Sequence, residues 1–344
     1  MKRDAMLLVR ALRDPARTGG LDADGWTALL AMARAEQLIG TLARRLSGLP
    51  MPDAVARILD EARINAEYQR RSALWEADCA RRALADYPGK VCLMKGTAYA
   101  AAGLKASEGR HIGDLDIMVA RGDLPQVEAA LLAAGWEWVK EDEYDDAYYR
   151  DHMHELPPLI HKERDRMIDV HHTILPLTAR PRPDAAAMLV DAVALENELY
   201  VFSPADMVIH SAAHLFADGE LDGGLRNLWD IHCLVTEFAE QQRDFFLSLT
   251  EDASHHGLSK AVSRALRLSR DLYGTELTSY TFPLKTDYGW HRQDKWYVMR
   301  LTARDNWGRG TRKFIRLIFY IRSHWLRMPP LMLMRHLWVK WRKG

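Results

Sequence analysis

The stretch GDLDIMV, residues 113–119, decides the fold that we expect for this chain. Polar and apolar residues alternate at its start and apolar residues complete it, which is typical of a strand with one buried face. Residues i and i+2 of a strand point to the same side, so Asp114 and Asp116 are predicted to present their carboxylates next to each other. Adjacent carboxylates repel each other unless a cation lies between them. The pair therefore predicts a binding site for a hard divalent ion, which is either Mg²⁺ or Mn²⁺.

A third carboxylate is predicted to lie on a neighbouring strand. The segments HELPPLIHK (154–162) and MIDVHH (167–172), joined by the turn ERDR, predict a hairpin whose second arm carries Asp169 between two apolar residues. Three carboxylates on adjacent strands suit two-metal phosphoryl transfer, in which one metal activates the attacking hydroxyl and the other neutralises the triphosphate. We therefore predict Asp114, Asp116 and Asp169 as metal ligands and catalytic residues, with the third completing the site or acting as general base.

The segment upstream predicts where phosphates would bind. VCLMK (91–95) is an apolar run typical of a buried strand, and it continues into a Gly-Thr turn and a helix rich in small residues. Backbone N–H groups at such a turn, with a helix N-terminus behind them, form an anion site, and nearby cationic side chains add positive charge. The predicted nucleotide-binding residues are Lys95, Gly96, Thr97, Arg110 and Gly113.

The order of these segments resembles the nucleotidyltransferase superfamily whose palm domain is like that of DNA polymerase β. More closely, the chain is similar to an uncharacterised bacterial nucleotidyltransferase family marked by the pattern LKG…R..GDxDxLV…xDxH. Here the pattern stands as LMKG (93–96), Arg110, GDLDIMV (113–119) and IDVHH (168–172). The similarity continues in the helical half and the tail, in SPADMVIHSAAHLF (203–216), LRNLWDIHCLV (225–235) and YIRSHWLRMPPLMLMRHL (320–337).

The resemblance implies an α+β fold in which a nucleotidyltransferase palm, a mixed sheet with flanking helices, is embedded between helical regions. It also implies Mg²⁺-dependent transfer of an NMP from an NTP to a hydroxyl of an acceptor, with release of pyrophosphate. The chain departs from the superfamily in two places. Thr97 stands where the superfamily has Gly or Ser, and sixteen residues separate it from Asp114.

We expect four segments along the chain. A helical region covers 1–88, the palm 89–182, a second helical region 183–306, and a basic tail rich in tryptophan 307–344. Ser203 and Pro204 predict the N-cap and first residue of a helix, and Asp123 predicts another N-cap. The predicted helices include residues 53–85, 123–134, 203–216, 225–238 and 253–273.

Four further residues are weighed as contacts to the acceptor or to phosphate. His171 shares a strand face with the third carboxylate, and His214 lies four residues after His210 on one predicted helix. The simpler interpretation of these two helical histidines is one packed and one hydrogen-bonded side chain, rather than a shared metal. Arg226 and Asp230 are also four residues apart, which is the spacing of an ordinary helix ion pair.

Composition limits the other functions. The 47 Lys and Arg residues balance 47 Asp and Glu residues, which disfavours a nucleic-acid enzyme because no excess of positive charge surrounds the palm. Three cysteines without a CxxC pattern fit a reducing compartment. No signal-peptide core and no apolar run of membrane-spanning length are present. We therefore expect a soluble cytoplasmic protein.

The tail allows two interpretations. It carries ten positive charges and no acidic residue, together with Trp307, Trp325, Trp338 and Trp341. Such a segment suits peripheral contact with the inner membrane surface, where the basic residues face anionic lipid. The alternative is that its helices pack on the palm with the tryptophans in the core and the arginines in water. Pro329 and Pro330 predict a break before a last helix over 331–342.

Two interpretations of the palm also remain open. In the first it is an enzyme that acts on an NTP and on a hydroxyl-bearing acceptor, which is a small molecule, a peptide or a protein. In the second it is a catalytically silent palm that binds nucleotide or serves as a scaffold in a biosynthetic or toxin–antitoxin assembly. The presence of all three carboxylates favours the enzyme, and the sequence does not identify the acceptor.

Overall fold

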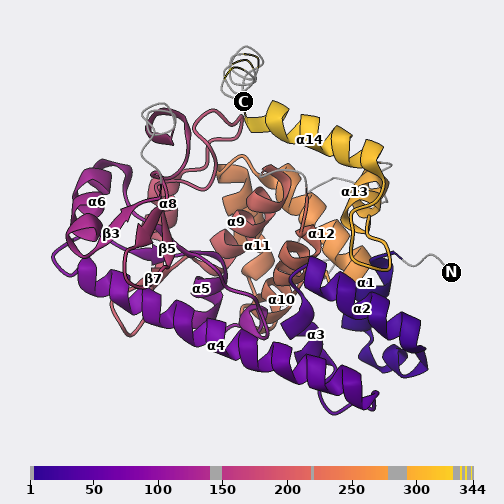
Figure 1. Ribbon diagram of the computed structural model, residues 1–344. Helices are drawn as coiled ribbons and strands as arrows, with labels where there is room; N and C mark the ends of the chain where they lie inside the picture. The colour runs from indigo at the N-terminus through magenta and orange to yellow at the C-terminus, as the bar shows by residue number, and fades with distance from the viewer. Residues whose placement is uncertain are drawn as a thin grey trace.

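A computed structural model describes residues 4–139, 149–217, 221–277 and 293–327, together with Met334, Trp338 and Arg342 (Figure 1). In this part of the chain a mixed sheet of seven strands is combined with many helices, so the fold is α+β, as predicted. Figure 1 shows the strands at one end of the molecule and the helices from α9 (Pro204–Ala217) to α12 (Ser259–Tyr273) in its middle. The long helix α4 (Asp53–Ala83) runs along one edge, where it contacts α3 (Ile39–Arg45) and α5 (Lys95–Ala101).

The N-terminal region is helical, as predicted. Its helices are α1 (Met6–Arg13), α2 (Ala23–Ala35), α3 (Ile39–Arg45) and α4 (Asp53–Ala83). The predicted helix over 53–85 is confirmed as α4, which ends two residues earlier and begins directly after Pro52. Proline suits that boundary because it cannot donate a backbone hydrogen bond within a helix.

The centre of the sheet places the predicted carboxylates together. It consists of β1 (Cys92–Leu93), β2 (Leu115–Met118) and β5 (Met167–His171), in the overall order β3-β4-β5-β2-β1-β7-β6. β2 runs antiparallel to β1 and parallel to β5, with Asp116 directly opposite Asp169. Paired residues on neighbouring strands share one face of a sheet. The prediction that the third carboxylate lies on an adjacent strand is therefore confirmed.

The outer strands complete this sheet on both sides. The predicted hairpin is confirmed as β4 (Leu159–His161) and β5, and β3 (Trp136–Trp138) pairs with β4. On the other side β7 (Tyr200–Val201) pairs with β1, and β6 (Val193–Ala194) pairs with β7. The helices associated with the strands are α5 (Lys95–Ala101), α6 (Leu124–Ala133) and α8 (Ala185–Val190).

Three local predictions are wrong at the boundaries of these elements. The strand expected over 91–95 has only two residues, because Lys95 already belongs to α5. The strand expected from residue 114 begins at Leu115, so Asp114 lies in the bend before it. Asp123 precedes α6 but does not cap it, because its carboxylate accepts a hydrogen bond from the Tyr87 hydroxyl at 2.8 Å.

The C-terminal region consists of packed helices. They are α9 (Pro204–Ala217), α10 (Gly224–Gln241), α11 (Phe245–His255), α12 (Ser259–Tyr273), α13 (Asp294–Leu301) and α14 (Lys313–Arg327). The predicted cap is confirmed, because the Ser203 hydroxyl accepts a hydrogen bond from the Asp206 N–H. The predicted helix over 253–273 is wrong. It is divided between α11 and α12 at Gly257, whose φ of +67° is left-handed and ends a helix.

One continuous hydrophobic core extends from Ala5 to Phe319. α14 contributes Ile315 and Phe319 to it and packs against α9 and α13. The expectation that the tail tryptophans fill the core is wrong for the three that are described, since Trp307, Trp325 and Trp338 are exposed. Trp341 and most of the last predicted helix lie outside the described residues. Among the helices that the structure describes, none combines the length and apolar character needed to span a membrane.

Candidate active site

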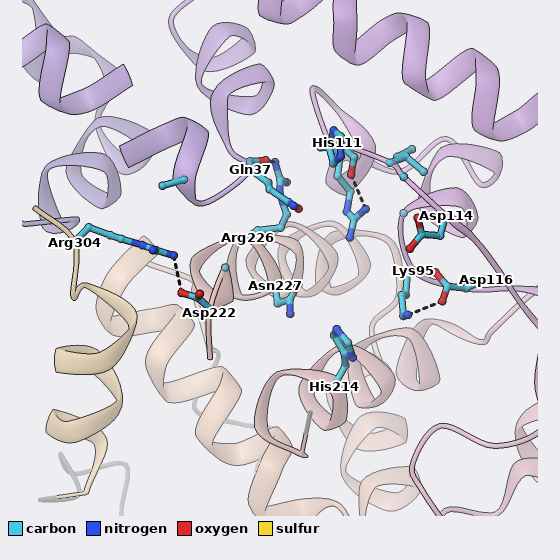
Figure 2. A pocket seen from close by; sticks show the side chains of 16 residues that line it. Gln37, Lys95, His111, Asp114, Asp116, His214, Asp222, Arg226, Asn227 and Arg304 are labelled. Carbon is cyan, nitrogen blue, oxygen red and sulfur yellow. Dashed lines mark hydrogen bonds and ion pairs between the residues drawn. The ribbon is translucent and has the colours of Figure 1, made fainter. Parts of the chain in front are cut away.

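A polar pocket of about 690 Å³ opens over the central strands. Its lining comes from the loop before β2, the start of α5, helices α9 and α10, and the segments that follow α2 and α13 (Figure 2). Asp114, Asp116 and Lys95 lie at one end, and Asp222 with Arg304 lies at the other. The pocket therefore joins the sheet to both helical regions of the chain.

Asp116 is the centre of the carboxylate end. It is 6% exposed, and its Oδ1 accepts hydrogen bonds from the Lys95 ammonium at 2.5 Å and from His171 Nε2 at 3.0 Å. Asp169 is half-buried on the same face of the sheet, and Asp114 lies exposed at the pocket wall. The structure thus brings the three predicted carboxylates to one region, with a lysine ammonium among them.

The carboxylates of this region influence one another strongly. Burial alone would raise the pKa of Asp116, but Lys95 and the hydrogen bond from His171 hold it well below its usual range. Burial raises the pKa of Asp169 to about 7, and the charge of Asp116 adds to this increase while Lys95 opposes it. A further cation would relieve this repulsion. Carboxylate oxygens are the ligands that Mg²⁺ prefers, so the chemistry of this donor set suits a divalent ion.

Lys95 adopts an unusual backbone conformation at the junction of β1 and α5. Its φ is +49°, in the left-handed region that costs a non-glycine residue of the order of 1 kcal/mol or more. Burial would lower the pKa of its ammonium, but Asp116 outweighs this effect and Asp169 adds to it, so the pKa is raised. Lys95 therefore keeps its positive charge in contact with Asp116.

Gly96 is needed for a reason other than the turn that the sequence suggested. Its φ is not in the left-handed region, but a Cβ at this position would lie 2.9 Å from Arg110 Cζ and closer still to Nη1. The glycine leaves space for the Arg110 guanidinium to pass against the start of α5. Gly113, in the same pocket, has open space around it.

A buried ion cluster fixes two guanidinium groups beside the pocket. Asp230 is 2% exposed and lies 3.0 Å from Arg110 Nε and 3.1 Å from Arg226 Nη1. Arg226 also donates to the Gln37 carbonyl and to the Thr41 hydroxyl, at 3.0 and 2.5 Å. The predicted ion pair within α10 is confirmed. Because one carboxylate serves two guanidinium groups, the cluster keeps a net positive charge where Arg110 and Arg226 line the pocket.

The other predicted residues divide between the pocket and its surroundings. His214 lines the pocket, whereas His210 is buried against Phe202 with its ring 5.6 Å away. Thr97 is 1% exposed and does not line the pocket, and its hydroxyl has no hydrogen-bond partner in the described part of the chain. Three other predicted residues do not line the pocket but pair with or contact residues that do: Asp169, His171 and Asp230.

Several pocket residues were not predicted from the sequence. Arg304 lies 2.7 Å from both Glu36 and Asp222, and it joins the segments after α13 and α2 to the start of α10. His111 and Asn227 are single polar residues next to predicted ones, so the sequence indicated only weakly that they line the pocket. No local pattern connects Glu36 with Arg304, because their contact depends on the folded chain.

Comparison with known families agrees with this geometry. A family model described as an uncharacterised nucleotidyltransferase matches residues 22–274. The chain belongs to this family. The match includes the N-terminal helices from α2 onward, which the resemblance in sequence did not, and it ends before the tail, which the resemblance included. A comparison with curated proteins finds no match.

Proposed function

We propose that the protein is a Mg²⁺-dependent nucleotidyltransferase that moves an NMP from an NTP to a hydroxyl group of a small molecule, a peptide or a protein. The observation that carries the proposal is the register of β2 and β5, which sets Asp116 opposite Asp169 beside a polar pocket in a chain of this family. A volume of about 690 Å³ lies within the range of pockets that hold cofactor-sized ligands.

Asp114 and Asp116 would hold the divalent ion, which when bound lowers the pKa of the acceptor hydroxyl and neutralises phosphate charge. Asp169 lies opposite Asp116 and would act as the general base that accepts the proton of that hydroxyl. The acceptor oxygen forms a bond to the α-phosphorus as the bond between the α- and β-phosphates breaks. Pyrophosphate leaves, and the proton remains on the carboxylate.

The cations of the pocket would bind the triphosphate. Arg110 and Arg226 are held in place by Asp230, so their guanidinium groups are already oriented when an anion arrives. Lys95 lies beside them and would exchange part of its contact with Asp116 for phosphate. Gly96 and Gly113 would form the wall that phosphate approaches, while the end near Asp222 and Arg304 remains for the acceptor or the base.

The decisive experiment is a screen of labelled NTPs with Mg²⁺ and cell extract, followed by mass spectrometry of any labelled product. Wild-type protein is compared with Asp114→Asn, because Asp114 is exposed and its charge is not part of a buried pair. We expect a labelled product that is lost in the variant and after removal of the metal. NTP binding without any product would instead support the catalytically silent palm, and equal labelling by the variant would contradict the metal site.

We also propose that α14 contacts an anionic membrane surface. Its exposed side carries a stripe of large apolar residues, and its N-terminal end is flanked by three exposed cations, Arg309, Arg312 and Lys313. Apolar side chains that enter the lipid headgroup region beside basic residues are typical of interfacial helices. The stripe consists of Phe314, Leu317, Ile318, Ile321 and Trp325.

Flotation with vesicles tests this contact. We expect the full chain to float with vesicles that contain phosphatidylglycerol at low salt, and Leu317→Gln with Ile321→Gln to reduce that fraction several-fold. Val190→Gln is the matched control, because Val190 is exposed and apolar but lies on α8. A truncation after Met328 separates the contribution of α14 from that of the following residues. Absence of flotation at low salt would exclude the proposal.

A further inference from the structure

A second group of metal-ligating side chains lies behind the carboxylates. Among the described residues, His154, Glu155 and His171 have donor atoms that all lie within 4.8 Å of one another. Glu155 Oε2 is 3.3 Å from His171 Nδ1 and 3.6 Å from His154 Nε2. Bond lengths of zinc to nitrogen and oxygen imply that two ligands of a tetrahedral ion lie about 3.4 Å apart. The observed separations are close to this value.

The backbone fixes these donors in position. Residues 154–156 pair along β5, through a bridge between Glu155 and His171 and a hydrogen bond from the His172 N–H to the His154 carbonyl at 2.9 Å. The group therefore rests on the sheet ladder rather than on a separate loop. Sites supported by regular elements hold their ligands more accurately than sites on loops.

The hydrogen bond between His171 and Asp116 leaves the other ring nitrogen of His171, Nδ1, available on the side of Glu155. Its Nε2 lies 3.0 Å from the Asp116 carboxylate, so Nε2 carries the proton and Nδ1 presents a lone pair. His171 is 2% exposed, and among the residues that the structure describes its Nδ1 has no hydrogen-bond partner. A carboxylate that holds the far nitrogen of a metal-bound histidine is a frequent outer partner in zinc sites. A lone pair buried opposite the Glu155 carboxylate calls for a cation between them.

We propose that His154, Glu155 and His171 bind a borderline divalent cation of the Zn²⁺ type, at a site separate from the Mg²⁺ carboxylates. Two imidazole nitrogens and one carboxylate oxygen form a ligand set for Zn²⁺ or Co²⁺, whereas Mg²⁺ prefers oxygen ligands alone. His171 connects this site to Asp116, so the cation would fix the position of the carboxylate from behind. The inference does not depend on nucleotide transfer.

Titration with Co²⁺ alone, in the absence of nucleotide, tests the proposal. Full-length protein is stripped with a chelator, and Co²⁺ uptake is followed by its visible absorption and by competition with Zn²⁺. We expect one equivalent with the intense visible absorption of tetrahedral Co²⁺ in the wild type, and binding at this site at least tenfold weaker in His154→Ala and Glu155→Gln. Both side chains are partly exposed, so both variants should fold, which circular dichroism verifies.

Asp114→Asn is the matched control, because it removes a carboxylate of the other site and should retain Co²⁺ uptake. Zn²⁺ should also raise the melting temperature of the wild type and of Asp114→Asn, but not that of Glu155→Gln. Absence of a stoichiometric ion in the wild type, or equal affinity in the His154 and Glu155 variants, would overturn the proposal. Loss of uptake in Asp114→Asn would also overturn it, because the ion would then lie among the carboxylates.

Discussion

Replacement of Gly96 by alanine should separate Arg110 from Asp230. The new Cβ would lie 2.9 Å from Arg110 Cζ and 3.2 Å from Ile112 Cγ1, so the guanidinium would have to move. Its Nε donates to Asp230 at 3.0 Å and its Nη1 donates to the His111 carbonyl at 3.0 Å. Displacement of the guanidinium therefore removes contacts made by a buried charge.

The magnitude follows from these contacts. A hydrogen bond to a charged group contributes about 1.5–3 kcal/mol. Asp230 keeps its contact with Arg226, so its charge is not left unpaired. Helix propensity alone would favour alanine by about 1 kcal/mol, since Gly96 lies in α5. We expect Gly96→Ala to lower the free energy of unfolding by about 1–2 kcal/mol, in spite of the higher helix propensity of alanine.

Urea unfolding of four variants measures this coupling. Gly113→Ala is the control, because no atom lies within 4 Å of its added Cβ, and it should change stability by less than about 0.5 kcal/mol. In an Arg110→Ala background, Gly96→Ala should cause almost no further loss in the free energy of unfolding, and a double-mutant cycle measures this difference. Equal stability of the two glycine variants, or an unchanged cost in the Arg110→Ala background, would refute the reasoning.

Three further predictions concern charge and packing elsewhere. Asp114→Asn should abolish nucleotide transfer without loss of stability. Asp116→Asn should also destabilise the fold by about 1–3 kcal/mol, because it removes the carboxylate that the partly buried Lys95 ammonium contacts. Activity assays and urea unfolding of both variants check this. Burial, and then the charge of Arg45, lower the pKa of His232 to about 4. The unfolded chain takes up this proton below about pH 6.5 and the folded chain does not, so stability is complete above that pH and should fall by roughly 2 kcal/mol on going from pH 7 to pH 5. A His232→Asn variant should lose this slope in urea unfolding measured at both pH values. Gly40→Ala should weaken NTP binding and lower stability by about 1–3 kcal/mol, as isothermal titration calorimetry and urea unfolding would show.

The sequence predicted the part of the site that depends on local periodicity. The two-residue period of a strand and the apolar neighbours of Asp169 were sufficient to place it near Asp116, and the register of β2 and β5 confirms this. The same reasoning failed at Asp114, where the strand had not yet begun. It also failed at Gly257, because the local sequence did not show that this glycine adopts a left-handed conformation that divides a helix.

The contacts that the sequence did not reveal are those made between distant segments. The need for glycine at position 96 depends on where Arg110 lies, and the orientation of Arg110 depends on Asp230, 120 residues later. The group formed by His154, Glu155 and His171 likewise requires a bridge between two separate stretches of chain. Such contacts follow from tertiary packing, which local spacing does not encode.

The helical regions belong to the site as much as the sheet does. Gly40 in α3 meets the loop before β2 so closely that a Cβ would lie 2.5 Å from the Gly109 carbonyl oxygen, and a backbone atom cannot swing aside. The same helix supplies the Thr41 hydroxyl, and the turn before it supplies the Gln37 carbonyl, and both accept hydrogen bonds from Arg226. A displacement of α3 would therefore also move the guanidinium groups, although α3 itself carries none of the predicted catalytic residues. The family match begins at residue 22 and includes these helices, as expected if they form part of the pocket rather than a separate appendage.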